Sequence, residues 1–503
     1  MERQRVVVVG AGIAGLAAAY RIREQAHERR LDVEVLVLEA GSGVGGKIDT
    51  LNEDGFVCET GPNGFLDNEP ATLRLVDDLG LRDDLQRSED EARRRFLVRN
   101  GQLVEMHMNP VKFMRSPLLS FGAKLRMARE YWVKAKQDDA DETVGEFGRR
   151  RLGREFTEVM LDSMVSGIFA GDVDRLSVAA AFPKVTELEG KYGGLFRGMA
   201  AKRREVRARK KARAAEKAST PEAAPEANGT QKPRKVEAGP GGVLHSFREG
   251  MGQPIHTLAR SLGNAVRTST AVARIERLDA GFRVHLAEGD AIEADAVVVT
   301  LPAPAASQVL RGCAGEASDA LGEILIAGVH VVHVGVRKDQ VQNSLEGFGA
   351  LIPRREGIRT LGSIFTSSTF RGRAPKGYAL LTNMIGGRHD PEANELDEDQ
   401  LRRQVLDDVG PLLGIDGEPV FTKVVRWARG IPQYETGHLD RVRRAREDAA
   451  RVGGLFLGGN SVAGVSFNHC VLHAETLGHD VCDHLEARRD GRPAPAREGE
   501  ATS

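Results

Sequence analysis

The sequence predicts an α/β protein that begins with a doubly wound parallel sheet. Residues 5–9 are a mostly β-branched run, and residues 33–39 (VEVLVLE) repeat that pattern, which is typical of strands buried on both faces. Residues 14–28, between them, are expected to form a helix. Glycine is the third observation, because it makes up 57 of the 503 residues with only 20 prolines. That share exceeds the usual level of about 7% and indicates tight backbone loops.

Four later segments carry strand signals. Residues 328–336 (GVHVVHVGV) and 378–386 (YALLTNMIG) are expected to belong to a second sheet. Residues 294–301 (ADAVVVTL) and 454–459 (GLFLGG) are expected to return to the first sheet as buried strands. The chain therefore crosses between two sheets more than once.

Helix signals dominate residues 140–197, where Thr143 and Glu146 have the spacing of a capping box. A further helix is expected over 471–487. Between these regions, Arg197 to Lys217 contains ten Lys/Arg and two Glu, which predicts a solvated basic helix. The Pro/Gly/Ala-rich stretch 219–242 that follows has the composition of a disordered segment.

Composition excludes several classes of protein. Lys+Arg is 71 and Asp+Glu is 72, so net charge points to neither nucleic acid nor an anionic surface as a partner. The four cysteines form no C-x-x-C pair and no histidine cluster completes a metal set, so we expect free thiols and no metal site. The longest apolar run, 6–20, is shorter than the roughly 20 residues of a spanning helix. The spacing of the three glycines in this run argues against a secretory signal, so we expect a cytoplasmic protein.

The glycines of that run have the spacing of a dinucleotide site. Gly10, Gly12 and Gly15 form G-x-G-x-x-G directly after a strand and at the start of a helix. This arrangement permits a tight turn, close approach of a pyrophosphate, and close packing of helix on strand. Glu39 ends the next strand, where a carboxylate accepts hydrogen bonds from a ribose diol.

Further glycine-rich segments favour FAD over NAD as the cofactor. Gly45, Gly46 and Lys47 follow Glu39 at once, where the longer body of FAD passes close to the backbone and a basic side chain reaches a phosphate. Residues 59–64 (ETGPNG) form a rigid turn against which a flavin ring can lie. Residues 458–466 (GGNSVAGVS) follow a buried strand and open toward a helix, a second place for phosphate or ribityl contacts.

Four longer motifs carry a family resemblance. They are residues 59–72 (ETGPNGFLDNEPAT), 166–183 (SGIFAGDVDRLSVAAAFP), 426–442 (RWARGIPQYETGHLDRV) and 459–471 (GNSVAGVSFNHCV). With the dinucleotide motif, they resemble the flavin amine oxidase-like superfamily and, within it, the oxygen-dependent protoporphyrinogen oxidases, including bacterial enzymes that take coproporphyrinogen III. The resemblance covers nearly the whole chain except 198–240 and the C-terminal tail.

This resemblance implies a Rossmann-type FAD-binding domain, a discontinuous α+β substrate domain and a helical domain that contacts the membrane. It implies noncovalent FAD, a tetrapyrrole substrate, O2 as the acceptor, no nucleic acid, in many members a homodimer, and peripheral contact with the inner face of the cell membrane. The expected boundaries are 1–70, 241–305 and 425–487 for the FAD domain, 71–100 and 306–424 for the substrate domain, 101–197 for the helical domain, 198–240 for a basic and disordered insertion, and 488–503 for a disordered tail.

The resemblance also assigns residues to the two sites. Expected cofactor contacts are Gly10, Gly12, Ile13, Ala14, Gly15, Glu39, Ala40, Gly45, Gly46, Lys47, Gly61, Pro62, Asn63, Val272, Trp427, Gly459, Asn460, Gly464, Val465 and Ser466. Expected substrate contacts are Asn63, Gly167, Phe169, Phe348, Leu351 and Met384, and no catalytic acid or base is assigned. One departure concerns the substrate propionates: animal and plant members place an arginine near the position of Leu66, and this stretch has none.

Other readings remain open on the sequence. An amine or polyamine oxidase of the same fold often uses tyrosines near the C-terminal flavin loop, and none lies within 459–473. A carotenoid desaturase is a further alternative. The basic run 197–217 fits a linker helix, attraction to anionic lipid, or nucleic-acid binding, although no stacking aromatics are interleaved in it. The last alternative is a non-enzymatic one, a flavin-bearing scaffold or nucleic-acid adaptor that works through 197–217.

Overall fold

A computed structural model describes residues 3–107, 109–219 and 242–492, with only the backbone described over 209–219. The first sheet has five parallel strands in the order β10-β2-β1-β14-β20. Their bounds are β1 Gln4–Val9, β2 Val33–Leu38, β10 Val266–Arg267, β14 Ala296–Val299 and β20 Leu455–Leu457. The predicted βαβ start and both returning strands are thus confirmed, the latter being shorter than expected.

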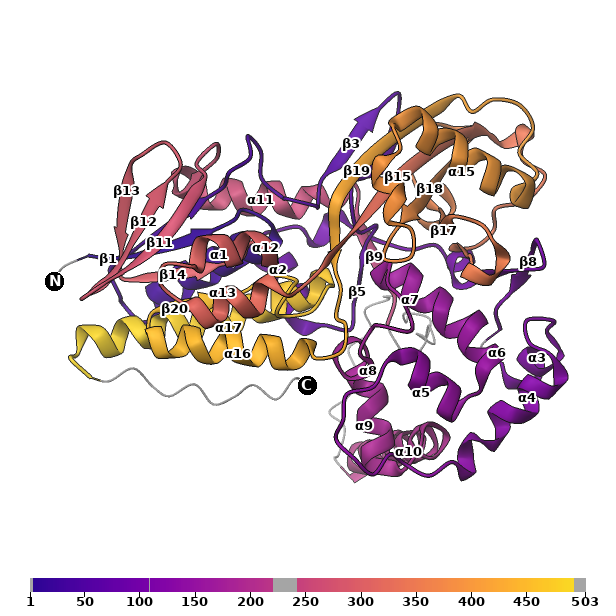
Figure 1. Cartoon of the computed structure of the whole chain (residues 1–503). Coiled ribbons are helices and arrows are strands. Elements are labelled where there is room, and N and C mark those ends of the chain that lie inside the picture. The colour runs from indigo at the N-terminus through magenta and orange to yellow at the C-terminus, as the bar shows by residue number, and fades with distance from the viewer. Residues whose placement is uncertain (1–2, 108, 220–241, 493–503) are drawn as a thin grey trace.

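Helices and a small sheet cover the two faces of this parallel sheet (Figure 1). Val6 and Val8 face one core, whereas Val7 and Val9 face the other, which explains why the strand is apolar without alternation. The first core includes α1 Ile13–Glu28, α2 Pro70–Asp78, α11 Gly252–Leu262 and α17 Phe467–Arg489. The second includes α12 Ala303–Leu310, α13 Gly315–Gly322, α16 His438–Val452 and the antiparallel sheet β11 Val272–Leu278, β12 Gly281–Leu286, β13 Ala291–Ala294.

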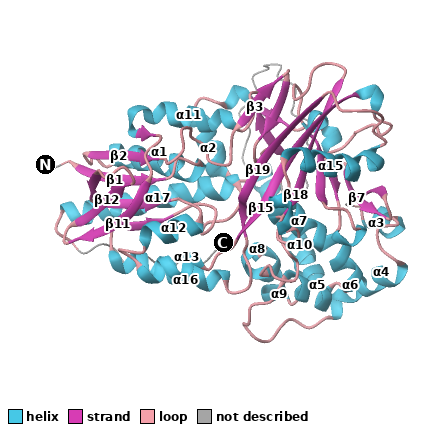
Figure 2. Cartoon of the chain, turned by 45° about the horizontal axis from the view of Figure 1, so that its top comes forward, coloured by secondary structure: helices cyan, strands magenta, loops and turns pink. Residues whose placement is uncertain are grey.

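The second large sheet has seven strands in the order β19-β15-β18-β17-β16-β7-β8, and Figure 2 shows its long strands beside the parallel sheet. Only the β16–β7 pairing is parallel. The bounds are β7 Arg95–Arg99, β8 Gln102–Glu105, β15 Ile326–Arg337, β16 Gly349–Leu351, β17 Thr360–Phe365, β18 Tyr378–Gly386 and β19 Phe421–Pro432, with α14 Thr366–Thr369 after β17 and α15 Glu398–Leu413 packed on the sheet. The two strands predicted for it, 328–336 and 378–386, are adjacent and antiparallel.

Two short sheets join these bodies. One is the hairpin β3 Thr50–Glu53 and β4 Phe56–Glu59, and the other has the order β5-β9-β6, with β5 Phe65–Leu66, β6 Leu85–Arg87 and β9 Leu244–Phe247. Both lie next to the turn at 59–64 and so fix where it sits.

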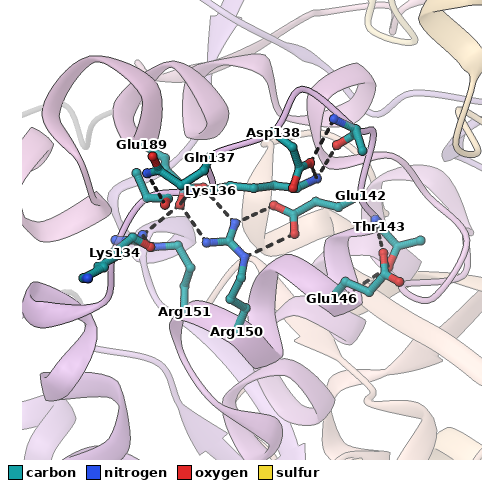
Figure 3. Close-up of polar contacts among 12 residues, drawn as sticks. Lys134, Lys136, Gln137, Asp138, Glu142, Thr143, Glu146, Arg150, Arg151 and Glu189 are labelled. Carbon is teal, nitrogen blue, oxygen red and sulfur yellow. Dashed lines mark hydrogen bonds and ion pairs between the residues drawn. The ribbon is translucent and has the colours of Figure 1, made fainter.

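The helical region confirms the predicted capping box. Thr143 Oγ1 accepts from the Glu146 N–H at 3.0 Å and Glu146 accepts from the Thr143 N–H at 2.8 Å. Near it, the guanidinium of Arg150 binds Glu142 and Glu189, and the fully buried Arg151 also binds Glu189 (Figure 3). Arg151 forms a second ion pair with the buried Glu130. The helices are α3 Pro110–Arg115, α4 Phe121–Ala128, α5 Val144–Arg151, α6 Arg154–Phe156, α7 Asp162–Phe169, α8 Val178–Ala181, α9 Pro183–Tyr192 and α10 Leu195–Ser219.

Some boundaries differ from the expected ones. The basic helix predicted over 197–217 is present within α10, and the remainder of the proposed insertion, 220–240, lies outside the described residues. The C-terminal helix is longer than expected, because Ser466 caps its start by accepting from the His469 N–H at 3.1 Å. It continues to Arg489, two residues into the predicted tail, and 493–503 are outside the described residues. Across the described ranges, no helix is long and apolar enough to cross a membrane.

Candidate cofactor and substrate site

The G-x-G-x-x-G turn leaves no space for larger residues at its third glycine. A Cβ on Gly15 would lie 1.9 Å from the carbonyl oxygen of Gly10, which itself has a φ of +103°. Thr300, at the end of β14, closes the turn by donating its hydroxyl to the Val9 and Gly10 carbonyls at 2.9 and 3.2 Å. Thr300 also lies against Gly459, so it joins the two ends of the proposed site.

The start of α1 is open to an anion. Gly12 is the N-cap, no side chain caps it, and the first turn holds no acidic residue. A Cβ on Gly12 would have no neighbour nearer than 3.9 Å, the carbonyl of Gly45. Ile13 and Ala14 begin the helix, so their N–H groups belong to its uncapped first turn. Free N–H groups and the helix dipole favour a phosphate at this point.

Glu39 is held in place beside this turn. Its carboxylate accepts from the Ala11 N–H and from the Gly41 N–H, each at 2.8 Å. Its backbone carbonyl accepts from the Thr270 N–H at 2.7 Å, which brings the start of β11, with Val272, to the same edge. Ala40 is exposed here. The arrangement fixes a carboxylate at the mouth of the turn, as the motif predicts.

The second glycine-rich loop folds back on the first. Gly45 forms an isolated bridge with Gly12 and donates its N–H to the Ala11 carbonyl at 2.8 Å. Gly46 is exposed next to Gly12. Lys47 is largely desolvated, and burial lowers its pKa to about 8. Among the described residues no carboxylate forms an ion pair with Lys47, so an anionic ligand would supply the missing partner.

The turn at 59–64 carries a buried polar atom without a partner. The Oδ1 of Asn63 is buried and makes no hydrogen bond within the described structure. Close contacts fix the turn around it: a Cβ on Gly61 would lie 2.2 Å from the Lys47 carbonyl, and Trp427 donates its indole N–H to the Thr60 carbonyl at 2.7 Å. Pro62 is partly exposed. A bound ligand with an N–H or O–H would satisfy the amide of Asn63.

A buried ionic network beneath this turn was not foreseen from the sequence. Glu59 accepts from the Met251 N–H at 3.0 Å and from Thr50 Oγ1 at 2.7 Å, and the guanidinium of Arg373 lies 3.3 Å away. Burial raises the pKa of Glu59 to about 7, and Arg373 opposes that shift. His333 of β15 lies 3.1 Å from the Glu59 carbonyl. The network ties the turn to both sheets.

The C-terminal loop completes the cofactor side. A Cβ on Gly459 would lie 2.9 Å from the Thr300 carbonyl, and the Asn460 carbonyl accepts from the buried hydroxyl of Tyr434. Gly464 lies against His469, and Val465 packs on the aromatic cluster of Phe169 and Tyr434, while Ser466 caps α17. Residues from both ends of the chain thus meet at one edge of the parallel sheet.

Of the six predicted substrate contacts, four gather around α7 and its C-terminal end. A Cβ on Gly167 would lie 2.5 Å from Leu351, and Met384 packs with Ala170 just after the helix. Phe169 is only 3% exposed and packs edge-on against Phe182 and at a tilt against Tyr434, so it supports this wall from behind. Asn63 lies in the turn at 59–64, on the cofactor side.

Phe348 lies next to an arginine that the sequence did not single out. The guanidinium of Arg95, on β7, sits 5.4 Å from the centre of the Phe348 ring. Arg95 is exposed, and none of the ion pairs in the described residues includes it. Only the pairing of β7 with β16 brings these two residues together. The structure thus offers a free cation on the substrate sheet that does not come from the stretch near Leu66.

Comparisons with known proteins agree with this geometry. The family of flavin containing amine oxidoreductases matches residues 13–476. The chain is 29% identical to coproporphyrinogen III oxidase of Bacillus subtilis, over 96% of this chain and 99% of that one, and 34% identical to the chloroplastic protoporphyrinogen oxidase of Nicotiana tabacum, over 95% and 85%. A crystal structure from Exiguobacterium sp. 255-15, provisionally assigned as a protoporphyrinogen oxidase, superposes with a TM-score of 0.78 at 26% identity, covering 97% of this chain and all of that one.

The predicted family is thereby confirmed, and the α/β fold of the sequence analysis agrees with these structures. The glycine turns, the uncapped helix and the paired sheets described above are the parts that a flavin enzyme of this kind needs. The chain belongs to the flavin-containing amine oxidoreductase family, as a flavin-dependent oxidoreductase related to the protoporphyrinogen and coproporphyrinogen III oxidases.

Proposed function

We propose that the protein oxidises a porphyrinogen, protoporphyrinogen IX or coproporphyrinogen III, to the porphyrin with noncovalent FAD and O2, a late step of heme biosynthesis. The observation that carries the proposal is similarity to both kinds of oxidase along nearly the whole chain, combined with an open cofactor turn at the sheet edge. The reaction removes hydrogen from the macrocycle in three two-electron steps.

The residues present fit FAD. The uncapped start of α1 would hold a phosphate, Glu39 would accept from a ribose, and Lys47 would gain the anion it lacks. When bound, the flavin supplies the acceptor for the hydride and passes the electrons to O2. The polypeptide then has to bind, orient and shield, because hydride transfer depends on position more than on an acid or base.

Two features of the site suit a porphyrinogen. The apolar wall of Gly167, Leu351 and Met384 suits the apolar body of the macrocycle, and the unpaired Oδ1 of Asn63 is an acceptor for its pyrrole N–H groups. Both candidate substrates carry propionate groups, and Arg95 is an exposed guanidinium without an ion pair among the described residues. We assign Arg95 to a propionate carboxylate, with Phe348 as the surface on which its guanidinium rests.

An amine oxidase is the alternative of the same fold, and the tyrosine positions argue against it. Tyr434 is the tyrosine next to the C-terminal loop, and its hydroxyl is buried and bound to the Asn460 carbonyl. It is therefore not available to line an amine cage.

Anaerobic mixing of the purified flavoprotein with each porphyrinogen tests the proposal. We expect the flavin absorbance to bleach, and fluorescent porphyrin to accumulate once air is admitted, with the faster substrate naming the preference. If neither porphyrinogen reduces the bound flavin but an amine reduces it, the protein is an amine oxidase and this proposal fails.

We further propose peripheral membrane contact through an exposed apolar face of the helical region. Phe121 is 80% exposed, Trp132 72% and Val111 61%, which is unusual for large apolar side chains, and the basic residues Lys112 and Arg115 lie beside Val111. We expect sedimentation with vesicles of phosphatidylcholine and phosphatidylglycerol, and its loss in Phe121→Ser/Trp132→Ser. Equal sedimentation of the parent and the variant would contradict the contact.

A further inference from the structure

Helix α7, which carries the wall of the proposed substrate site, has unusual ends. A π-helical turn, Thr157–Leu161, leads directly into it. Its last turn is closed by Ala170, which has a φ of +46° although it is not glycine. Such conformations persist only where the surroundings determine them. Contacts at both ends of α7 hold it in place.

The C-terminal end of α7 makes backbone contact with the end of β18. The Ala170 carbonyl accepts from the Arg388 N–H at 2.7 Å, and a Cβ on Gly387 would lie 2.6 Å from that same carbonyl. Just after the end of β19, Gln433 donates its side-chain N–H to the Phe169 carbonyl at 2.9 Å. The C-terminal end of α7 is thus attached to the strands β18 and β19.

The start of α7 is attached through a buried charge. Asp162 is 2% exposed, and its Oδ2 accepts from the Arg354 N–H at 3.0 Å. Arg354 follows β16 by three residues, so this contact joins α7 to the strand that carries Leu351. The guanidinium of Arg354 also lies 3.5 Å from Asp162 Oδ1, and 3.7 Å from each of Asp172 and Asp174.

His389 connects these two attachments. Arg354 Nη1 lies 2.8 Å from His389 Nδ1, and since a guanidinium only donates, Nδ1 is the acceptor. Burial and Arg354 lower the pKa of His389, so the neutral ring carries its proton on Nε2. That Nε2 faces Asp162 Oδ1 at 4.0 Å, and both atoms are buried without a hydrogen bond. A single water or a small shift closes this gap.

We propose that Asp162, Arg354 and His389 form a positioning cluster that fixes the α7 wall against β16 and β18, and so sets how the macrocycle lies against Gly167 and Leu351. The assignment of the macrocycle rests on the proposed function, whereas the fixing of α7 does not. None of the three residues is assigned to touch the substrate. They act through the helix and the strand end that they join.

Steady-state kinetics of the FAD-loaded enzyme test the cluster. We expect Asp162→Asn to raise the porphyrinogen KM about tenfold with kcat within about twofold, because the wall loosens while flavin chemistry is unchanged. His389→Gln should have a similar effect, and the double variant should be no worse than either single one. Asp174→Asn is the matched control, because Asp174 is exposed, shares Arg354 and lies outside α7. The cluster would be overturned if the KM increases of the two single variants multiply in the double variant, or if neither single variant changes KM.

Hydrogen exchange separates this inference from the proposed function. Amides of residues 165–169 should exchange about tenfold faster in Asp162→Asn and His389→Gln than in the parent or in Asp174→Asn, with or without substrate. If Asp162→Asn fails to fold, His389→Gln decides alone. An enzyme inactive on porphyrinogens that still shows this pattern would retain the cluster and reject the substrate. Conversely, an enzyme that oxidises porphyrinogens but shows unchanged amide exchange in both variants would retain the substrate and reject the cluster.

Discussion

The cofactor side and the substrate side of the molecule depend on different kinds of contact. On the cofactor side, the contacts that define the site are backbone groups: the uncapped N–H groups of α1, the carbonyls against Gly15 and Gly61, and the loop at Gly459. On the substrate side they are side chains, such as Leu351 against Gly167 and Arg95 over Phe348. Where backbone meets backbone, as at Gly15 and Gly61, there is no room for an added atom, whereas a contact between side chains can adjust by small shifts.

The sharpest test of this comparison is a pair of glycine variants. Gly15→Ala should destabilise the fold by about 3 kcal/mol or more, because its Cβ would meet a backbone oxygen at 1.9 Å. In Gly12→Ala the Cβ has no neighbour within 3.9 Å, so the melting temperature should stay close to the parent value while flavin affinity falls. Thermal melts and flavin titration measure both. Equal destabilisation of the two variants would break the comparison.

The substrate side should respond to loss of a single charge. Arg95→Ala should raise the porphyrinogen KM about thirtyfold, the equivalent of about 2 kcal/mol for a charge-assisted hydrogen bond, with the flavin spectrum unchanged. Arg93→Ala is the control, since its guanidinium is exposed and paired with Asp90 at 3.0 Å. If both variants behave alike, the propionate is bound elsewhere.

Lys47 gives the cofactor side a marked dependence on pH. Its pKa is about 8 because of burial, and an anionic ligand would raise it. FAD binding should therefore take up a proton above pH 8, and affinity should fall by up to tenfold per pH unit as pH rises from 8 toward the pKa of the complex. Below pH 8 this contribution is constant. Titration of the apoprotein with FAD from pH 6.5 to 9.5 measures the slope, which Lys47→Met should abolish.

The smallest expected effect lies outside both sites. Thr143→Ala removes the cap of α5 and should cost about 1 kcal/mol of stability without changing KM or flavin affinity. Chemical denaturation and a standard assay would check this. A change in KM would mean that the helical region is coupled to the substrate wall more tightly than the contacts of α7 indicate.

The sequence could predict features that depend on residues close in the chain, but not those that depend on pairing between distant segments. The strand–turn–helix of β1 and α1, the position of Glu39 and the cap at Thr143 all depend on residues close in the chain, so local patterns were enough. The roles of Thr300, Arg373 and Arg95 depend on strand pairing between distant segments, and no local pattern marks them. The ends of α17 are a different case, because the cap at Ser466 is local in the chain. The helix begins at Phe467 and ends at Arg489, whereas 471–487 was expected.

The order of strands in the parallel sheet has a consequence for synthesis on the ribosome. β1 and β2 are made first, β14 near the middle and β20 close to the end, yet α1 packs directly on α17. Until residues 455–489 have emerged, the part of α1 that packs on α17 has no cover and the loop at 458–466 is missing. The nascent chain thus carries a valine-rich, half-finished sheet for most of its translation, a state prone to aggregation. Cofactor capture by the complete site has to be one of the last events of folding.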